Sequence, residues 1–476
     1  MSEGPKVRGG RVRRTAPLVG MAGRTAGEAV IASLRGGDAK AEFHRRTAER
    51  YAERLGHSKG VLMKAGQIFS FASPQVGLPA EFQDVYRNAF ARLQDDAPPM
   101  PFDLVRERIE AELGAPLTEL FAEIDTEPLA AASIGQVHAA TLPDGRRVAV
   151  KVQYPGVDKA IRDDLANTEL LATFFRLMQS AIPGGSTSVD VRAMAEEVSA
   201  RIAEELDYVN EAANQRLFAD IYRGHPFIRV PEVHDELSTG RVLTSDLVTG
   251  MRWSEALACG QDLHDQWGEA IYRFCLGSIY EFHVFNADPH PGNYLFHDDG
   301  TVTFLDYGCV KRFTREQIDG LRGSIGAIVD GDARLLHRLF VERGIIGADS
   351  GVAPEDLMAW HAEMLVPTTA EQPFTFTEEY ASSVIQAGLS LNGPYRDVIR
   401  EVDFESDMVL LSRIDLGMTA VLGTLKATGY WGSIWREWGN GSPPETHYGE
   451  LHAAFMADRA SGPRPDKGDI HAHLSH

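Results

Sequence analysis

The alternation of hydrophobic and polar positions divides the chain into strand-like and helix-like segments. Two short runs, Arg146–Val152 and Arg241–Val248, are rich in apolar and β-branched residues, which is typical of strands. Leu142–Gly145 contains Pro, Asp and Gly and therefore predicts a turn just before the first run. Between the two runs, Val189–Arg223 is rich in Ala, Glu, Arg and Leu and predicts one long helix. Together these patterns predict an α+β fold.

Changes in composition and periodicity divide the chain into five segments. The expected segments are a flexible basic N-terminus (1–40), a helical extension (41–124), a unit containing strands (125–250), a mostly helical unit (251–430) and a loosely ordered C-terminal tail (431–476). The end of the tail, from Asn440, is rich in Gly, Pro, Asp and His. No internal repeat is present in the sequence.

Composition narrows the class of protein. The 476 residues are 43% hydrophobic and 24% charged, which is ordinary for a globular chain and enough for a core in two lobes. The net charge of −21 excludes a general role in binding nucleic acid. Three cysteines without metal-ligand spacing indicate a reducing compartment, and no apolar run is long enough to cross a bilayer. We therefore expect a cytoplasmic protein.

The N-terminus carries a cluster of positive charge. Its basic residues are Lys6, Arg8, Arg11, Arg13 and Arg14. A disordered basic arm is the simplest interpretation, and a peripheral contact with the membrane surface is the sharper alternative. An export signal is disfavoured because the apolar stretch that follows is short and is closed by Arg24.

The most informative chemistry lies in a spacing of three side chains. Asp288 is followed five residues later by Asn293, and Asp306 follows thirteen residues after that. Phosphoryl transfer needs one aspartate facing the nucleophile, and an asparagine with a second aspartate to hold Mg²⁺ against the phosphates. The spacing therefore predicts Asp288 as the catalytic residue and Asn293 and Asp306 as metal ligands.

A lysine and a loop of small residues precede this group, as nucleotide binding requires. Lys151 lies within the first predicted strand, where a lysine can contact the α- and β-phosphates. The predicted phosphate loop consists of Ala130, Ala131, Ala132, Ser133, Gly135 and Val137. Alanine in place of glycine stiffens such a loop and alters the pose of the nucleotide. The alternative is that Ala130–Ala132 simply begin a strand.

Two further contacts complete the predicted nucleotide site. The backbone near Asp246 and Val248, at the end of the second strand, is expected to bind the adenine edge. The strand lysine needs a glutamate from a helix, and Glu205 and Glu211 are both candidates. Six positions apart, they lie on different faces of one helix and therefore require different partners.

Taken together, these motifs resemble the UbiB-type atypical kinases, also called the AarF or ADCK family. The most specific is Lys64-Ala65-Gly66-Gln67, which is similar to the Lys-x-Gly-Gln signature of that family. Glu205-x-Asp207 is similar to its Glu-x-Asp element. The resemblance runs from about Lys59 to about Arg312.

The resemblance implies a two-lobed protein kinase-like fold, with the small lobe at 125–250 and the large lobe at 251–430. It also implies that Lys151 contacts Glu211 and that Lys64 contacts Glu205. The gating group over the site would then comprise Lys64, Gln67, Glu205 and Asp207. The expected cofactors are ATP and Mg²⁺.

The sequence departs from ordinary protein kinases after Asp306. No Ala-Pro-Glu follows, and a helical pattern begins soon after Thr314, which leaves little room for a peptide-docking segment. The resemblance implies ATP hydrolysis or phosphate transfer linked to quinone (ubiquinone biosynthesis) or isoprenoid lipid metabolism. The alternative is a nucleotide-binding pseudokinase scaffold with negligible turnover. A small-molecule phosphotransferase of the choline kinase type is disfavoured because such enzymes lack Lys-x-Gly-Gln and the alanine loop.

Overall fold

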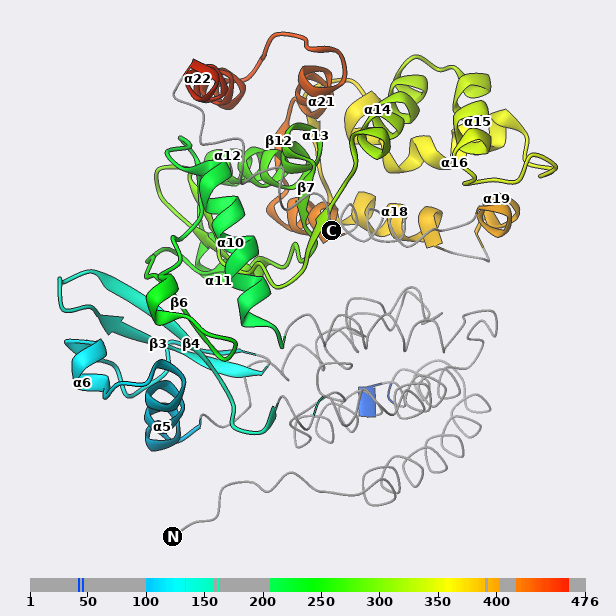
Figure 1. The fold of residues 1–476 in the computed structure, drawn as a ribbon. Helices are drawn as coiled ribbons and strands as arrows, with labels where there is room; N and C mark the ends of the chain where they lie inside the picture. Colours follow the sequence, from blue (N-terminus) through cyan, green and yellow to red (C-terminus); the bar gives the residue numbers. More distant parts are fainter. Residues whose placement is uncertain are drawn as a thin grey trace, which may run out of the picture.

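The computed structural model describes most of the chain from Met100 onward (Figure 1). The described residues are Glu42, Arg45, Arg46, 100–132, 134–157, 161, 206–389, 393–402 and 417–461. Lys64, Gln67, Ser133 and Glu205 lie outside them, as does nearly all of the expected segments 1–40 and 41–124. Helices and strands are both present, which gives the α+β fold.

A five-stranded antiparallel sheet forms the first part of the described chain (Figure 1). Its strands are β1 (Glu123–Ile124), β2 (Ala130–Ala132), β3 (Gly135–Thr141), β4 (Arg147–Gln153) and β6 (Val242–Asp246). The order is β1-β3-β4-β6, with β2 paired to β3. Val137 lies opposite Lys151, so β3 and β4 pair as a hairpin across the expected turn at Leu142–Gly145.

Two helices contact this sheet. Helix α5 (Phe102–Leu113) packs against β4, and the short α6 (Leu117–Leu120) follows it. The side chain of Gln136 on β3 anchors the start of α5, because it accepts a hydrogen bond from Met100 N at 2.8 Å. Helix α10 (Tyr208–Tyr222) contacts β6 and lies between the sheet and the helical remainder of the chain (Figure 1).

The remainder of the chain is mostly helical, with short strand pairs. Its helices are α11 (Trp253–Ala256), α12 (Gln261–Tyr272), the π-helical η2 (Arg273–Gly277), α13 (Ser278–Phe282), α14 (Arg315–Val329), α15 (Ala333–Glu342), α16 (Pro354–Met364), α17 (Val366–Thr369), α18 (Glu378–Leu389), α19 (Arg396–Glu401), α21 (Trp431–Asn440) and α22 (His447–Ser461). The short elements are β5 (Ile228–Arg229), η1 (Asp235–Leu237), β7 (Val284–Asn286), η3 (Pro291–Asn293), β8 (Tyr294–Phe296), β9 (Val302–Phe304), β10 (Val310–Arg312), β11 (Phe374–Thr375) and β12 (Thr428–Gly429).

Two hydrophobic cores hold these elements together. The larger one is rich in aromatic rings and joins α10, α12, η2, β9 and α21; Phe274 and Phe304, for example, stack at 3.6 Å between ring centroids. The second one lies among α14, α15, α16 and α19 around Leu336 and Trp360. No helix in the described part of the chain is both long and apolar enough to span a bilayer.

Two expectations about the helices are wrong. The long helix over Val189–Arg223 is not continuous, because Asp207 is the N-cap of α10 and its side chain accepts a hydrogen bond from Asn210 N. The backbone of an N-cap residue is not helical, so the helix begins only after Asp207. The argument that Glu205 and Glu211 share one helix therefore fails.

The loosely ordered tail expected over 431–476 is also wrong for residues 431–461. Helix α21 buries Trp431 and Ile434 completely, and α22 buries Tyr448 and His452. The glycines and prolines of this segment end helices and fit close contacts, as where Gly441 closes α21 with a left-handed backbone. A segment whose composition is typical of disordered chain therefore contributes residues to the larger hydrophobic core.

Candidate functional site

The predicted phosphate-binding lysine is paired with a glutamate. Lys151 Nζ on β4 lies 2.6 Å from Glu211 Oε1 on α10, and the glutamate side chain is only 4% exposed. Burial by itself lowers the pKa of Lys151, but the attraction of Glu211 and Asp306 exceeds that effect and raises the pKa. The ammonium group therefore stays charged, as contact with phosphate requires.

The start of α10 fixes the position of the glutamate. Asp207 caps the helix, so Glu211 falls in its first turn, where the helix dipole favours negative charge. The Tyr208 ring, one residue after the cap, lies 5.0 Å from Lys151 Nζ and adds a cation–π contact. In the described chain Asp207 is a helix cap; the gating partners expected for it, Lys64 and Glu205, lie outside the described residues.

Asp288 and Asn293 lie together in one loop between β7 and β8. Asn293 Nδ2 donates to Asp288 Oδ2 at 2.9 Å. The turn closes through His290 N to Asp288 O and through Asn293 N to His290 O. The amide uses its nitrogen on the aspartate, which leaves its oxygen as the atom that can bind a cation.

Asp306 follows β9 and is joined to the same loop through the backbone. Leu305 N donates to Asn293 O at 2.9 Å. Asn286 Nδ2 donates to Asp306 O at 2.6 Å, while Gly308 N donates to Asp306 Oδ1 at 2.9 Å. These bonds bring the three predicted residues of the Asp288, Asn293 and Asp306 set into one cluster of loops.

Helix α10 also contacts the Asp306 loop directly. Asn214 Nδ2 donates to Tyr307 O at 3.1 Å, and the rings of Phe218 and Tyr307 lie 5.1 Å apart. The Tyr307 hydroxyl is buried and donates a hydrogen bond to Phe304 O. One helix thus presents Glu211 to the strand lysine and supports the loop of the second aspartate.

Asn286 and Asn214 have supporting roles that sequence reasoning did not assign. Asn286 also accepts a hydrogen bond from Asp288 N at 3.3 Å, so it links both aspartates. The text Asn286-Ala287-Asp288, which stands where kinases have His-Arg-Asp, is a signal for the first. Nothing in the sequence marks Asn214, because its partner is 93 positions away.

The predicted phosphate loop is the hairpin of β2 and β3. Ala130 pairs with Val137 and Ala132 with Gly135, so the alanines do form a strand, as the alternative interpretation expected. A Cβ at Gly135 would clash with the carbonyl oxygen of Val152 on β4, which explains the glycine there. A strand is compatible with phosphate binding at the turn of the hairpin, and the predicted contact Ser133 lies outside the described residues.

The expected adenine-binding segment lies at the end of β6. Asp246 N donates to Glu232 O and Leu247 N donates to Arg147 O, so these two N–H groups belong to the sheet. The Asp246 side chain pairs with His234 Nε2 at 2.8 Å. Contact of the Asp246 carbonyl and the Val248 N–H with an adenine edge stays a prediction.

The ligand set is suited to Mg²⁺ held with phosphates. Asp306 and Asn293 offer oxygen atoms, both are partly exposed, and hard cations prefer oxygen. Within the described residues, no group of three or more His, Cys, Asp or Glu side chains is arranged for a metal ion. Mg²⁺ in nucleotide sites takes one or two carboxylates and completes its shell with phosphates and water.

Similar proteins place the chain in a family. Residues 92–340 match the model described as the ABC1 atypical kinase-like domain. The chain is 34% identical over 286 residues to the atypical kinase COQ8B of Rattus norvegicus, a match that covers 60% of this chain and 52% of that protein. It is 33% identical over 304 residues to a chloroplastic aarF domain-containing protein kinase of Arabidopsis thaliana, covering 63% and 42%. The chain thus spans about half the length of these relatives.

A solved structure is similar over most of the chain. The Rv3197–erythromycin complex from Mycobacterium tuberculosis matches with a TM-score of 0.59 and 27% sequence identity, covering 85% of this chain and 99% of that one. The family match extends over more than half of the chain and includes the strand lysine, α10 and the loops of both aspartates. The chain therefore belongs to the ABC1 atypical kinase-like family, the UbiB/ADCK group that includes the aarF domain-containing and COQ8 kinases.

Proposed function

We propose that this chain binds ATP with Mg²⁺ and hydrolyses or transfers the γ-phosphate. The observation that carries the proposal is the role of α10, which presents Glu211 to Lys151 and supports the Asp306 loop through Asn214. The strand lysine and the Asp306 loop, which are distant in the sequence, thereby contact the same helix. Binding and positioning of this kind account for most of the catalysis in such sites.

Each residue of the site has a distinct role in this proposal. Lys151, held by Glu211, would contact the α- and β-phosphates, and the β2–β3 hairpin would cover them. Asn293 and Asp306 would hold Mg²⁺, which when bound neutralises charge on the phosphates. Asp288 would orient water or a substrate hydroxyl, because its Oδ2 is held by Asn293 and the residue is exposed.

The substrate class that we propose is a quinone precursor or another isoprenoid lipid, with peripheral contact to a membrane. The resemblance to the COQ8 kinases supports this class. The alternative is a pseudokinase scaffold that binds nucleotide with negligible turnover. Its support is the alanine loop and the direct passage from β10 into α14, which begins at Arg315.

A macrolide is a second candidate ligand. The solved structure that resembles this chain over 85% of its length is a complex with erythromycin. Erythromycin therefore belongs among the compounds tested with this protein.

The test is Mg²⁺-dependent ATP hydrolysis by the full chain, alone and with lipid vesicles, quinone-like phenols or erythromycin. We expect hydrolysis that rises with lipid or phenol and is lost in Asp306→Asn. The exposed turn residue Asp298 gives a matched control, since Asp298→Asn makes the same chemical change in the same part of the chain. Nucleotide binding without turnover in both wild type and Asp306→Asn would favour the scaffold.

The gating role of the Lys-x-Gly-Gln segment is tested separately with Lys64→Ala. If Lys64 and Gln67 restrict access to the site together with Glu205 and Asp207, the variant should hydrolyse ATP or accept substrates differently from the wild type. Unchanged rates on every substrate would remove this role.

A further inference from the structure

The C-terminal end of α10 is capped by an arginine from the last helix that the structure describes. The last turn of α10 contains no basic residue, and its final carbonyl groups need donors from elsewhere. Arg459 on α22 supplies them: its Nη1 donates to Asp220 O at 2.7 Å and to Ile221 O at 2.8 Å. A cation at this end of the helix also interacts favourably with the helix dipole.

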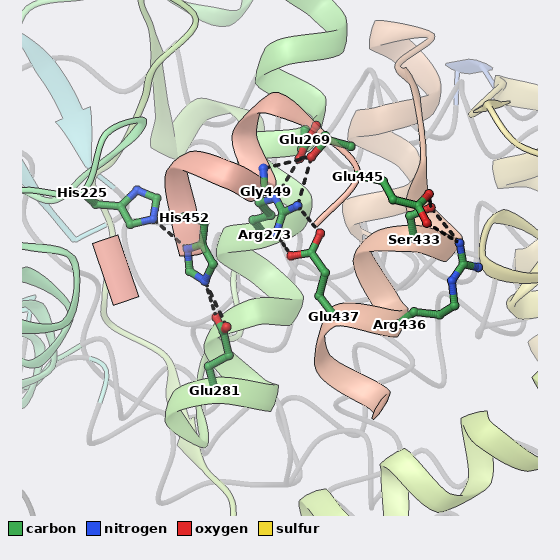
Figure 2. A network of polar contacts seen from close by, with 11 residues as sticks. His225, Glu269, Arg273, Glu281, Ser433, Arg436, Glu437, Glu445, Gly449 and His452 are labelled. Carbon is green, nitrogen blue, oxygen red and sulfur yellow. Dashed lines mark hydrogen bonds and ion pairs between the residues drawn. The ribbon is translucent and has the colours of Figure 1, made fainter. Parts of the chain in front are cut away.

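A chain of polar contacts attaches α22 to the segment just after α10 (Figure 2). His225 Nε2 lies 3.0 Å from His452 Nδ1, and His452 Nε2 lies 2.9 Å from Glu281 on α13. His225 Nδ1 accepts from the N–H of Ile228 at 3.1 Å, so the proton of neutral His225 is on Nε2. His225 therefore donates to His452, and His452 donates to Glu281.

Aromatic packing reinforces the same attachment. Tyr448 and Phe227 stack at 4.2 Å between centroids, and Phe455 meets the His225 ring edge-on at 4.7 Å. The Tyr448 hydroxyl donates to Gly300 O at 3.0 Å. Helix α22 thus contacts the end of α10, the segment that follows it and the β8–β9 turn.

The segment that leads into α22 is itself anchored in the helical part of the chain (Figure 2). Arg273, which is 2% exposed, donates to both oxygens of Glu437 on α21 at 2.8 Å. Its Nε donates to Glu269 at 2.8 Å, and Thr446 donates to the same carboxylate at 2.6 Å. Helix α22 therefore contacts α10 while the segment that precedes it is anchored to α12 and η2.

We propose that α22 is a positioning element for the Lys151–Glu211 pair, and that Arg459 is the positioning residue that acts on α10. Helix α10 is 15 residues long, about 22 Å at the usual rise, and shifts as one rigid unit. Its first turn carries Glu211, and its last turn carries the carbonyl groups that accept from Arg459. Release of the far end lets the helix shift, and Glu211 moves relative to Lys151. This inference rests on the proposed use of that pair in ATP binding.

The test uses the full chain with Arg459→Ala, Arg459→Gln and Arg459→Lys. Lysine keeps the charge, glutamine keeps a donor, and alanine keeps neither. Arg315→Ala is the matched control, because the Arg315 side chain is 88% exposed. For each protein, hydrogen exchange of the α10 amides, the melting temperature, and KM and kcat for ATP are measured.

We expect Arg459→Ala to speed exchange along the whole of α10, including the turn of Glu211, and to raise KM for ATP roughly fivefold. Arg459→Lys should restore most of both effects, with Arg459→Gln between them. A merely structural role would lower the melting temperature or the active fraction and leave KM unchanged.

Three outcomes would overturn the positioning role. In the first, exchange in α10 matches that of wild type and of Arg315→Ala. In the second, exchange changes only in the last turn and KM stays constant. In the third, KM rises equally in the lysine variant. If the wild type neither binds nor hydrolyses ATP, the proposed function fails, whereas the exchange data still decide whether Arg459 orders the first turn of α10.

Discussion

Gly135 shows at the scale of one residue how closely the alanine loop is built onto the sheet. It pairs with Ala132 on one side and with Gln153 on the other. A Cβ there would meet the backbone of Val152, which cannot move aside as a flexible side chain can. The hairpin beside Lys151 therefore depends on a missing side chain, and its position depends on backbone packing.

Gly135→Ala should lower the free energy of unfolding by about 1–3 kcal/mol, since the β3–β4 pairing must shift to admit the methyl group. The matched control is Gly326→Ala in α14, where a Cβ would meet nothing within 4 Å. That change should be neutral or stabilising by up to about 1 kcal/mol, because alanine favours helix. Urea unfolding of both variants checks this, and equal effects would contradict the account of Gly135.

Arg273 connects several elements that are far apart in the sequence. It lies in η2, pairs with Glu269 one turn earlier in α12, and pairs with Glu437 in α21. Gly449 at the start of α22 has no room for a Cβ beside the guanidinium and Glu437. The elements of the C-terminal segment are therefore fixed by one buried cation and two carboxylates.

Arg273→Met should destabilise the fold by about 3–5 kcal/mol, because it leaves the largely buried carboxylates of Glu269 and Glu437 without their arginine. Arg315→Met, which removes an exposed arginine, should change stability by no more than about 0.5 kcal/mol. Denaturant midpoints measured with constant slopes give both values. Similar losses in the two variants would show that the buried network does not hold α21 in place.

The sequence predicted which candidate side chains lie close together better than it predicted the elements around them. The strand lysine and the Asp288, Asn293 and Asp306 spacing depend on local pattern, and the structure brings the three loop residues together. The beginning of α10 was missed because the helix-like composition on both sides of Asp207 outweighed the tendency of aspartate to cap helices. The packing of α21 and α22 was missed because contacts such as that of Arg459 with Asp220, 239 positions apart, leave no periodic signal.

At the scale of the whole molecule, burial of histidine links the fold to pH. Burial, together with the facing His452 and Arg273, lowers the pKa of His225 from 6.5 to about 2. Glu281 faces His452 from the other side. The unfolded chain binds a proton on this histidine below pH 6.5 and the folded chain does not. The stability is therefore complete above about pH 6.5 and is lost progressively as the pH falls toward 2.

We expect the free energy of unfolding to fall between pH 7.5 and 5.5, with His225 contributing up to about 1.4 kcal/mol per pH unit below 6.5. In His225→Gln the fall should be smaller by that contribution. The other described histidines whose pKa burial lowers are common to both proteins and cancel in the comparison; they are His138, His283, His297 and His361. Identical pH dependence in the two proteins would contradict the claim that the buried His225 stays neutral in the folded protein.

The measurement that tests the central claim most directly is Mg²⁺-dependent binding of a fluorescent ATP analogue. Wild type, Asp306→Asn and the control Asp298→Asn are titrated with and without Mg²⁺. A site built from Lys151, Asn293 and Asp306 predicts that Mg²⁺ tightens binding at least about tenfold in wild type and in the control. It also predicts that Asp306→Asn stays folded and loses this Mg²⁺ effect. The same Mg²⁺ effect in all three proteins would contradict the assignment of Asp306 and the account of the site.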